Sequence, residues 1–139
     1  MHTRWATATL LLAALILAGC QRSENKERGE QMFTAIRGYG NDLRWGEFRQ
    51  AASRLLAREP EARDAQPKPL PDGLRKIRVS QYRIKEIVID PEGNAATATA
   101  EIDYYHADKL RLRTITDTQS WWYEEEEKQW YLDGSLPEF

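Results

Sequence analysis

The sequence predicts an α+β domain in which N-terminal helices pack on a coiled four-stranded antiparallel sheet. Apolar residues recur at spacings of three and four between Met32 and Leu56, as they do on one face of a helix. Residues 60–73 contain four prolines and interrupt this pattern. From Ile77 onwards the apolar period falls towards two, which is typical of strands with one buried face.

Two helices are expected first. One begins at Gly29, and Gly38 and Gly40 predict its end. Its apolar stripe is Met32, Phe33, Ile36 and Tyr39. Asn41 or Asp42 would cap the second helix through a side-chain oxygen. Its stripe is Trp45, Phe48, Ala52, Leu55 and Leu56, and Pro60 would end it.

Residues 60–73 are interpreted as a stiff Pro-rich connector rather than as a ligand for an aromatic groove. They separate a helical half from a strand half. Neither half could bury its apolar face alone, so residues 29–139 are expected to form a single domain.

The first two strands are expected at 77–90 and 94–105. The alternation of the first slips near Glu86, which suggests a bulge. Asp90–Gly93 is a strong turn, with Pro at its second position and Gly at its fourth. One face of the second strand carries Ala96, Ala98, Ala100, Ile102 and Tyr104.

The third and fourth strands are expected at 110–123 and 129–132, after a reversal at 106–109 and around a charged hairpin tip at 124–128. Strands of this length reach about 40 Å and must coil. We therefore expect the helices to fill the concave face, where the row of small Ala residues allows close approach.

This order of helices and a four-strand meander resembles the cystatin-like and nuclear-transport-factor-2-like folds. The Gly40–Leu43 stretch looks like that superfamily's turn between helices, with Asn41 intervening, and Lys128–Leu132 resembles its last strand. The resemblance implies a cone-shaped pocket between sheet and helices. It implies no activity, because the fold hosts enzymes, binders and scaffolds.

The first twenty residues predict an export signal that ends before Cys20. Arg4 precedes an apolar run at 6–18, which is shorter than the roughly 20 residues of a membrane-spanning helix. The run ends in Leu17, Ala18, Gly19 and Cys20, which resemble the lipobox of bacterial lipoproteins at all four positions. The alternative is an ordinary secretory signal in which a Cys occurs by chance.

The lipobox resemblance implies a diacylglycerol thioether on Cys20, cleavage between Gly19 and Cys20, and acylation of the new amine. The chain would then comprise a signal peptide at 1–19, a lipidated tether at 20–28 and the domain at 29–139. Cys20 would hold the protein on a lipid bilayer. Because Gln21 stands where Asp would favour inner-membrane retention, the resemblance implies the periplasmic face of the outer membrane, with the inner membrane as the alternative.

Composition limits the function classes. The mature part would keep 120 residues, 19 of the 20 Lys and Arg residues and all 22 acidic residues, so its net charge is near −3. A negative net charge argues against nucleic-acid binding, because domains that bind nucleic acid carry an excess of basic residues. Cys20 is the single cysteine, so no disulfide can form within the chain.

Few residues suggest catalysis. His106 is the only histidine of the mature part, and Asp103 and Asp108 flank it. His106 with either aspartate could transfer a proton to or from a bound substrate, but a histidine at a turn is usually solvated. We predict no metal and no cofactor, since the spacing of metal-site motifs is absent from the sequence and the carboxylates of residues 124–127 diverge at a hairpin tip.

The strongest interaction signal is an aromatic cluster across the last hairpin: Trp121, Trp122, Tyr123, Trp130 and Tyr131. Adjacent strand residues point to opposite faces, so one set is expected in the core and the other could form an exposed platform for a sugar ring or a protein.

The leading hypothesis is therefore a non-enzymatic, membrane-anchored accessory or interaction module of the cell envelope, with an envelope protein or glycan as partner. The alternatives are a binder of a small or hydrophobic ligand in the sheet–helix pocket, and a pocket enzyme that uses His106.

Overall fold

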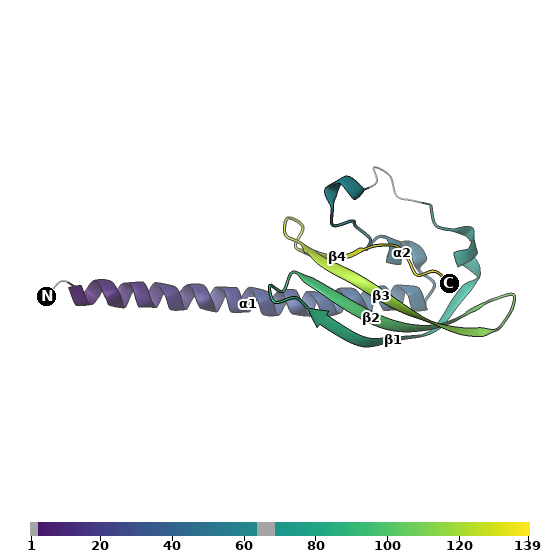
Figure 1. Ribbon diagram of the computed structural model, residues 1–139, viewed down its shortest axis with the longest axis horizontal. Coiled ribbons are helices and arrows are strands. Elements are labelled where there is room, and N and C mark those ends of the chain that lie inside the picture. Colours follow the sequence, from purple (N-terminus) through teal and green to yellow (C-terminus); the bar gives the residue numbers. More distant parts are fainter. Residues whose placement is uncertain (1–2, 64–68) are drawn as a thin grey trace.

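The computed structural model describes the backbone of residues 3–63 and 69–139 and the side chains of residues 22–63 and 69–139. A long helix is followed by short helical segments and then by the sheet (Figure 1). The elements are α1 (Thr3–Arg44), α2 (Phe48–Ala52), the 3₁₀ turns η1 (Pro60–Ala62) and η2 (Asp72–Lys76), β1 (Ile77–Ile89), β2 (Ala95–His106), β3 (Leu112–Glu124) and β4 (Gln129–Asp133). The predicted α+β class is confirmed.

The sheet is an antiparallel meander in the order β1-β2-β3-β4. The register of β1 against β2 shifts between Ile84 and Glu86, where the sequence predicts a bulge, and also between Val79 and Gln81. The turn after β1 is closed by a hydrogen bond of 3.0 Å from the Gly93 N–H to the Asp90 carbonyl. Periodicity therefore places all four strands to within two residues of their observed ends.

Helix α1 does not end at Gly38 or Gly40, as the sequence predicts, but continues to Arg44. Both glycines instead lie where other side chains press against the helix. A Cβ on Gly40 would overlap the ring of Tyr82, and a Cβ on Gly38 would lie 2.8 Å from the guanidinium of Arg54. The two glycines are explained by close packing rather than by helix termination.

The second expected helix is reduced to the five residues of α2. Gly46, with φ of +75°, adopts the left-handed conformation that follows many helices. Asp42 lies inside α1 and pairs with Arg54 at 2.8 Å instead of capping a helix. Trp45, expected in an apolar stripe, is 78% exposed because the chain turns at this point.

After α2 the chain runs beside β4 rather than continuing as a helix. The Leu132 N–H donates to the Arg54 carbonyl at 2.9 Å, and the Leu56 N–H donates to the Leu132 carbonyl at 3.0 Å. Leu55 and Leu132 thus form a parallel bridge. Part of the Pro-rich connector, residues 64–68, lies outside the described residues.

The core lies between α1 and the concave face of the sheet. Met32, Ile36, Tyr39 and Leu43 are fully buried along one stripe of α1, whereas Phe33 is 43% exposed on the neighbouring face. The sheet contributes the predicted row of β2, all of it buried: Ala96, Ala98, Ala100, Ile102 and Tyr104. Helix α1 fills most of the concavity, and α2 adds Phe48 and Ala51 to the same core.

Candidate functional site

The concave face of the sheet holds a polar cluster, which we call the Tyr–Asp–Gln cluster: the buried Tyr39 and Gln119 and the half-buried Tyr82 and Asp117. Gln119 is 2% exposed and lies next to the fully buried Trp121. Its amide nitrogen donates to the Tyr82 hydroxyl and to the Asp117 carboxylate, both at 2.7 Å. Its carbonyl accepts the Trp121 indole N–H at 3.0 Å. Gln119 therefore uses both ends of its side chain to hold two strands and the core indole together.

Burial shifts the titration of this cluster. Loss of solvent raises the pKa of Asp117 above its ordinary range, although the hydrogen bond from Gln119 opposes this. Burial likewise raises the pKa of Tyr82 to about 12. The hydroxyl of Tyr39 is buried without a hydrogen-bond partner in the described part of the chain, and its pKa is raised in the same direction. All three groups are therefore held towards their neutral forms.

Sequence analysis did not identify this cluster. A signal was present: residues 115, 117, 119 and 121 share the inward face of β3, and two of them are polar. A polar pair at inward positions of a strand is a signature of a buried network, because isolated buried polar groups are costly.

The predicted aromatic cluster is assembled as two sets on opposite faces of the last hairpin. The inward set is Trp121, Tyr123 and Trp130, with a Tyr123–Trp130 ring separation of 5.6 Å. The outward set is Trp122 and Tyr131, whose ring centroids lie 6.1 Å apart.

The outward set does not form the exposed platform that the sequence left open. Trp122 is only 7% exposed, because the segment after α2 covers it. Its indole N–H donates to the Leu56 carbonyl at 2.9 Å, and the Arg63 guanidinium lies 5.3 Å above its ring. The Tyr131 hydroxyl donates to Glu127, which raises the pKa of Tyr131 to about 12. These aromatic rings serve mainly to hold the connector on the sheet.

His106 and its two candidate partners lie apart. Asp103 faces the convex side, where the guanidinium of Arg83 at 2.7 Å and the hydroxyl of Thr114 hold its pKa below the usual range. Asp108 pairs with Lys76 at 2.6 Å, which lowers the pKa of that carboxyl. The His106 Nδ1 atom is 3.9 Å from Asp108, at the exposed end of the sheet. The structure therefore does not bring His106 and Asp103 together, and Asp108 is already paired with Lys76.

Two surface grooves flank α1. The larger, about 490 Å³, lies between α1 and the β4 hairpin and includes Glu30, Gln31, Arg54 and Trp130. The smaller, about 260 Å³, lies between α1 and β1 and includes Arg37, Arg44 and Tyr82. Both lie beside the filled concavity rather than within it.

The side chain of Cys20 and those of Leu17, Ala18 and Gly19 lie outside the described residues. The backbone from 20 to 28, expected as a tether, belongs to α1. Within the residues open to description, no helix combines the length and apolar character needed to cross a membrane.

The site is therefore characterised by its own geometry alone. Comparison of this chain with protein-family models, with curated proteins and with solved structures finds no match.

Proposed function

We propose that this chain is a lipoprotein of the bacterial cell envelope, held on a bilayer through acylated Cys20 and acting as a non-enzymatic accessory or interaction module. The anchor rests on the four lipobox-like residues and on the short apolar run before them. The outer membrane, at its periplasmic face, is the proposed location because Gln21 follows the cysteine, and the inner membrane is the alternative.

One structural observation supports an interaction role over a pocket function. Large side chains of α1 fill the concave face, and Tyr39 packs edge-on against Trp121 with ring centroids 5.8 Å apart. Together with Met32, Ile36 and Leu43, they occupy the space in which a cone-shaped pocket was expected. The outer surfaces of the domain are then the places at which it could meet a protein or glycan partner.

The anchor has a direct test. Labelled palmitate should enter the full chain in its bacterial host and not the Cys20→Ala variant, while Gly19→Ala serves as a matched control that keeps the thiol. Cleavage should leave Cys20 as the first residue, which mass spectrometry of the amino-terminal peptide detects. Equal labelling of wild type and Cys20→Ala would contradict the proposal.

A second candidate function is the binding of a small polar ligand in the groove between α1 and the β4 hairpin. The observation that favours it is Gln31, whose side-chain oxygen is buried on the wall of this groove without a hydrogen-bond partner among the described residues. A ligand with a donor group could satisfy that oxygen. Thermal shifts induced by a library of amines and sugars in wild type, and abolished by Gln31→Leu, would support it. Identical shifts in both proteins would exclude this groove.

A further inference from the structure

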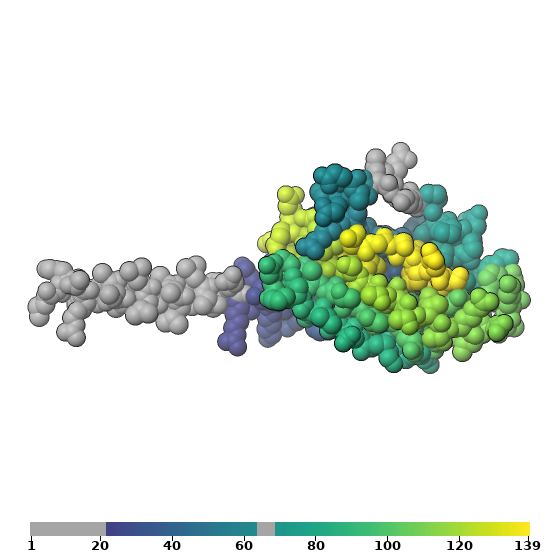
Figure 2. Space-filling model, in the orientation of Figure 1, coloured from purple at the N-terminus to yellow at the C-terminus, as the bar shows by residue number. Residues whose placement is uncertain are grey.

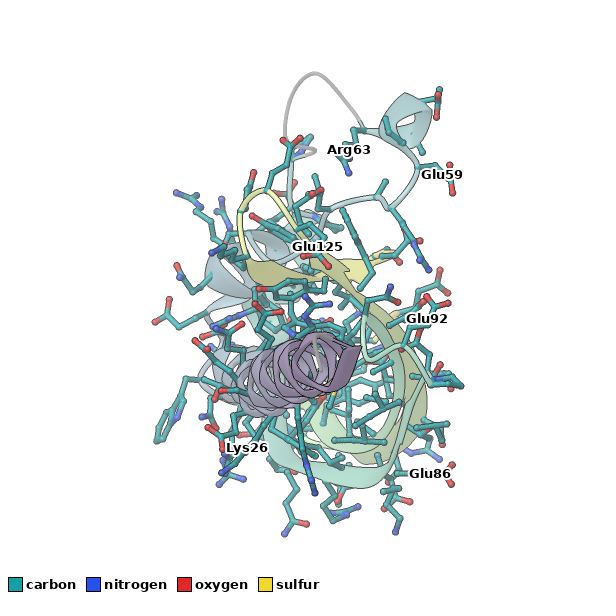
Figure 3. All side chains as sticks on the ribbon, turned by 90° about the vertical axis from the view of Figure 1, so that its left-hand side faces the viewer. Lys26, Glu59, Arg63, Glu86, Glu92 and Glu125 are labelled. Carbon is teal, nitrogen blue, oxygen red and sulfur yellow. The ribbon has the colours of Figure 1, made fainter. Side chains whose placement is uncertain are left out.

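The two ends of the sheet carry opposite charge. The β1–β2 and β3–β4 turns lie at the end nearer the N-terminus, and the β2–β3 hairpin lies at the far end (Figure 1). Extended strands of this length reach about 40 Å. Seen along α1 from its N-terminal side, Glu125 lies above the helix and Glu92 and Glu86 lie to its right, while Lys26 lies to its lower left (Figure 3). The near end also holds the acidic run 124–127.

The far end is basic, and we call it the basic tip. It joins the hairpin 107–113 to the neighbouring residues 72–78, because the Ala107 N–H donates to the Lys76 carbonyl at 2.8 Å. Two acidic residues, Asp72 and Asp108, accompany six exposed basic residues: Arg75, Lys76, Arg78, Lys109, Arg111 and Arg113. In the described part of the chain, no ion pair involves the three basic residues of the hairpin, Lys109, Arg111 and Arg113.

The basic tip also exposes two leucines. Leu110 is 76% exposed and Leu112 is 61% exposed, and the hairpin reads Lys-Leu-Arg-Leu-Arg from Lys109 to Arg113. Leu110 has φ of +49°, a left-handed conformation that is uncommon for a bulky residue. The N–H groups of Lys109 and Leu110 both donate to the His106 carbonyl, at 2.9 and 3.0 Å.

We propose that the basic tip binds the surface of an anionic phospholipid bilayer, with Leu110 and Leu112 entering the interface and the flanking basic side chains at the headgroups. This combination of apolar residues and Lys or Arg is the one used by segments that lie in membrane interfaces. The tip is a protruding end of the molecule, green at the right of the space-filling view (Figure 2).

The proposal goes beyond the anchor and does not depend on it. The test uses the chain from residue 20 onwards with Cys20→Ser, so that neither the apolar run at 6–18 nor an acyl chain holds it on a bilayer. A new cysteine, Ala107→Cys, carries an environment-sensitive fluorophore. The protein is mixed with vesicles of phosphatidylcholine, with or without about 30 mol% phosphatidylglycerol as the anionic lipid. A second labelled protein, Lys128→Cys, reports on the opposite end. Quenching by lipids that carry a nitroxide on the acyl chain detects entry into the bilayer.

We expect the fluorophore at 107 to be quenched in vesicles that contain phosphatidylglycerol and not in phosphatidylcholine alone, while the fluorophore at 128 is unaffected in both. Each basic residue at an anionic surface strengthens binding about fivefold. Arg111→Ser with Arg113→Ser should therefore weaken the tip's association about 25-fold and abolish the quenching. Leu110→Ser with Leu112→Ser should also abolish it.

The matched control is Val88→Ser with Ile89→Ser, which removes two exposed apolar side chains, 55% and 44% exposed, from the opposite end of the sheet. It should leave the quenching at 107 unchanged. Absence of quenching that depends on phosphatidylglycerol would overturn the proposal. Quenching retained in the leucine variant would show that Leu110 and Leu112 do not make the contact with the interface, and equal quenching at 107 and 128 would indicate adsorption of the whole domain. Either result refutes the proposed lipid contact, and neither bears on acylation of Cys20.

Discussion

Replacement of Gly40 by alanine tests the packing of α1 on the sheet. In an exposed helix interior, glycine to alanine stabilises a protein by about 1 kcal/mol, because alanine has the higher helix propensity. At Gly40 the new Cβ would overlap the ring of Tyr82, so that the ring or the helix must move. Overpacking of this kind costs about 1–3 kcal/mol.

A displaced Tyr82 would also lose its hydrogen bond from Gln119, for a further cost of about 1 kcal/mol. When the gain in helix propensity is subtracted from these two costs, Gly40→Ala is expected to lower the free energy of unfolding by about 1–3 kcal/mol. Gly29→Ala, on the same helix and with nothing within 4 Å of its Cβ, should gain about 1 kcal/mol. The two substitutions, chemically identical, should therefore differ by about 2–4 kcal/mol.

Urea denaturation of the chain from Gln21 onwards, followed by the fluorescence of buried Trp121 and Trp130, measures both free energies of unfolding. Tyr82→Phe separates the two causes, because it removes the hydroxyl and keeps the ring. In a Tyr82→Ala background the substitution at Gly40 should become stabilising. A gain for Gly40→Ala equal to that of Gly29→Ala would refute the close approach of Tyr82 to the helix.

Three further substitutions test other contacts. Asp117 binds its proton more tightly in the folded state, because burial raises its pKa, so wild-type stability should fall as pH rises above the unfolded value of about 4. The advantage of Asp117→Asn should consequently grow between pH 4 and 7, in urea titrations at each pH. Arg54→Ala removes the half-buried ion pair with Asp42 and should cost about 1–3 kcal/mol by the same assay. Trp122→Phe loses the indole bond to the Leu56 carbonyl and should cost about 1 kcal/mol and speed proteolysis of the segment after α2; unchanged proteolysis would contradict that contact.

The sheet could be predicted from the sequence because its signals are local. The alternation of Ala96–Tyr104 identifies the buried face of β2, and Pro91 and Gly93 identify the turn before it. The pattern also indicates the bulge near Glu86. Each of these features depends on residues within a few positions of one another.

The helical half could be predicted only in part, because its glycines respond to distant residues. Gly40 looks like a helix breaker until Tyr82, more than forty positions later in the chain, is placed against it. Likewise, Leu55 and Leu56 fit a helical stripe but pair with Leu132 in β4. Tertiary contacts of this kind override local propensity and have no local sequence signal.

The candidate sites also differ in whether they depend on neighbouring residues in the sequence or on tertiary contacts. The lipobox-like residues before and at Cys20 are a contiguous motif and could be read directly. The Tyr–Asp–Gln cluster joins α1, β1 and β3, so only the folded chain brings it together. The basic tip joins residues before β1 to the β2–β3 hairpin, and its charge is hidden within a chain whose overall charge is −2.

Helix α1 links the proposed anchor to the fold. The helix continues without interruption from the stretch around Cys20 into the core, and Met32 is the first fully buried residue among those of its side chains that the structure describes, from residue 22 onwards. At 1.5 Å per residue these two positions are about 18 Å apart along the helix axis. A domain held by a lipid on Cys20 would consequently sit close to its leaflet with the acidic turns nearest to it, and an anionic surface would repel those turns. The same repulsion would direct the basic tip away from the anchoring leaflet, so a second lipid contact through the tip requires either a tilt of α1 or a facing membrane.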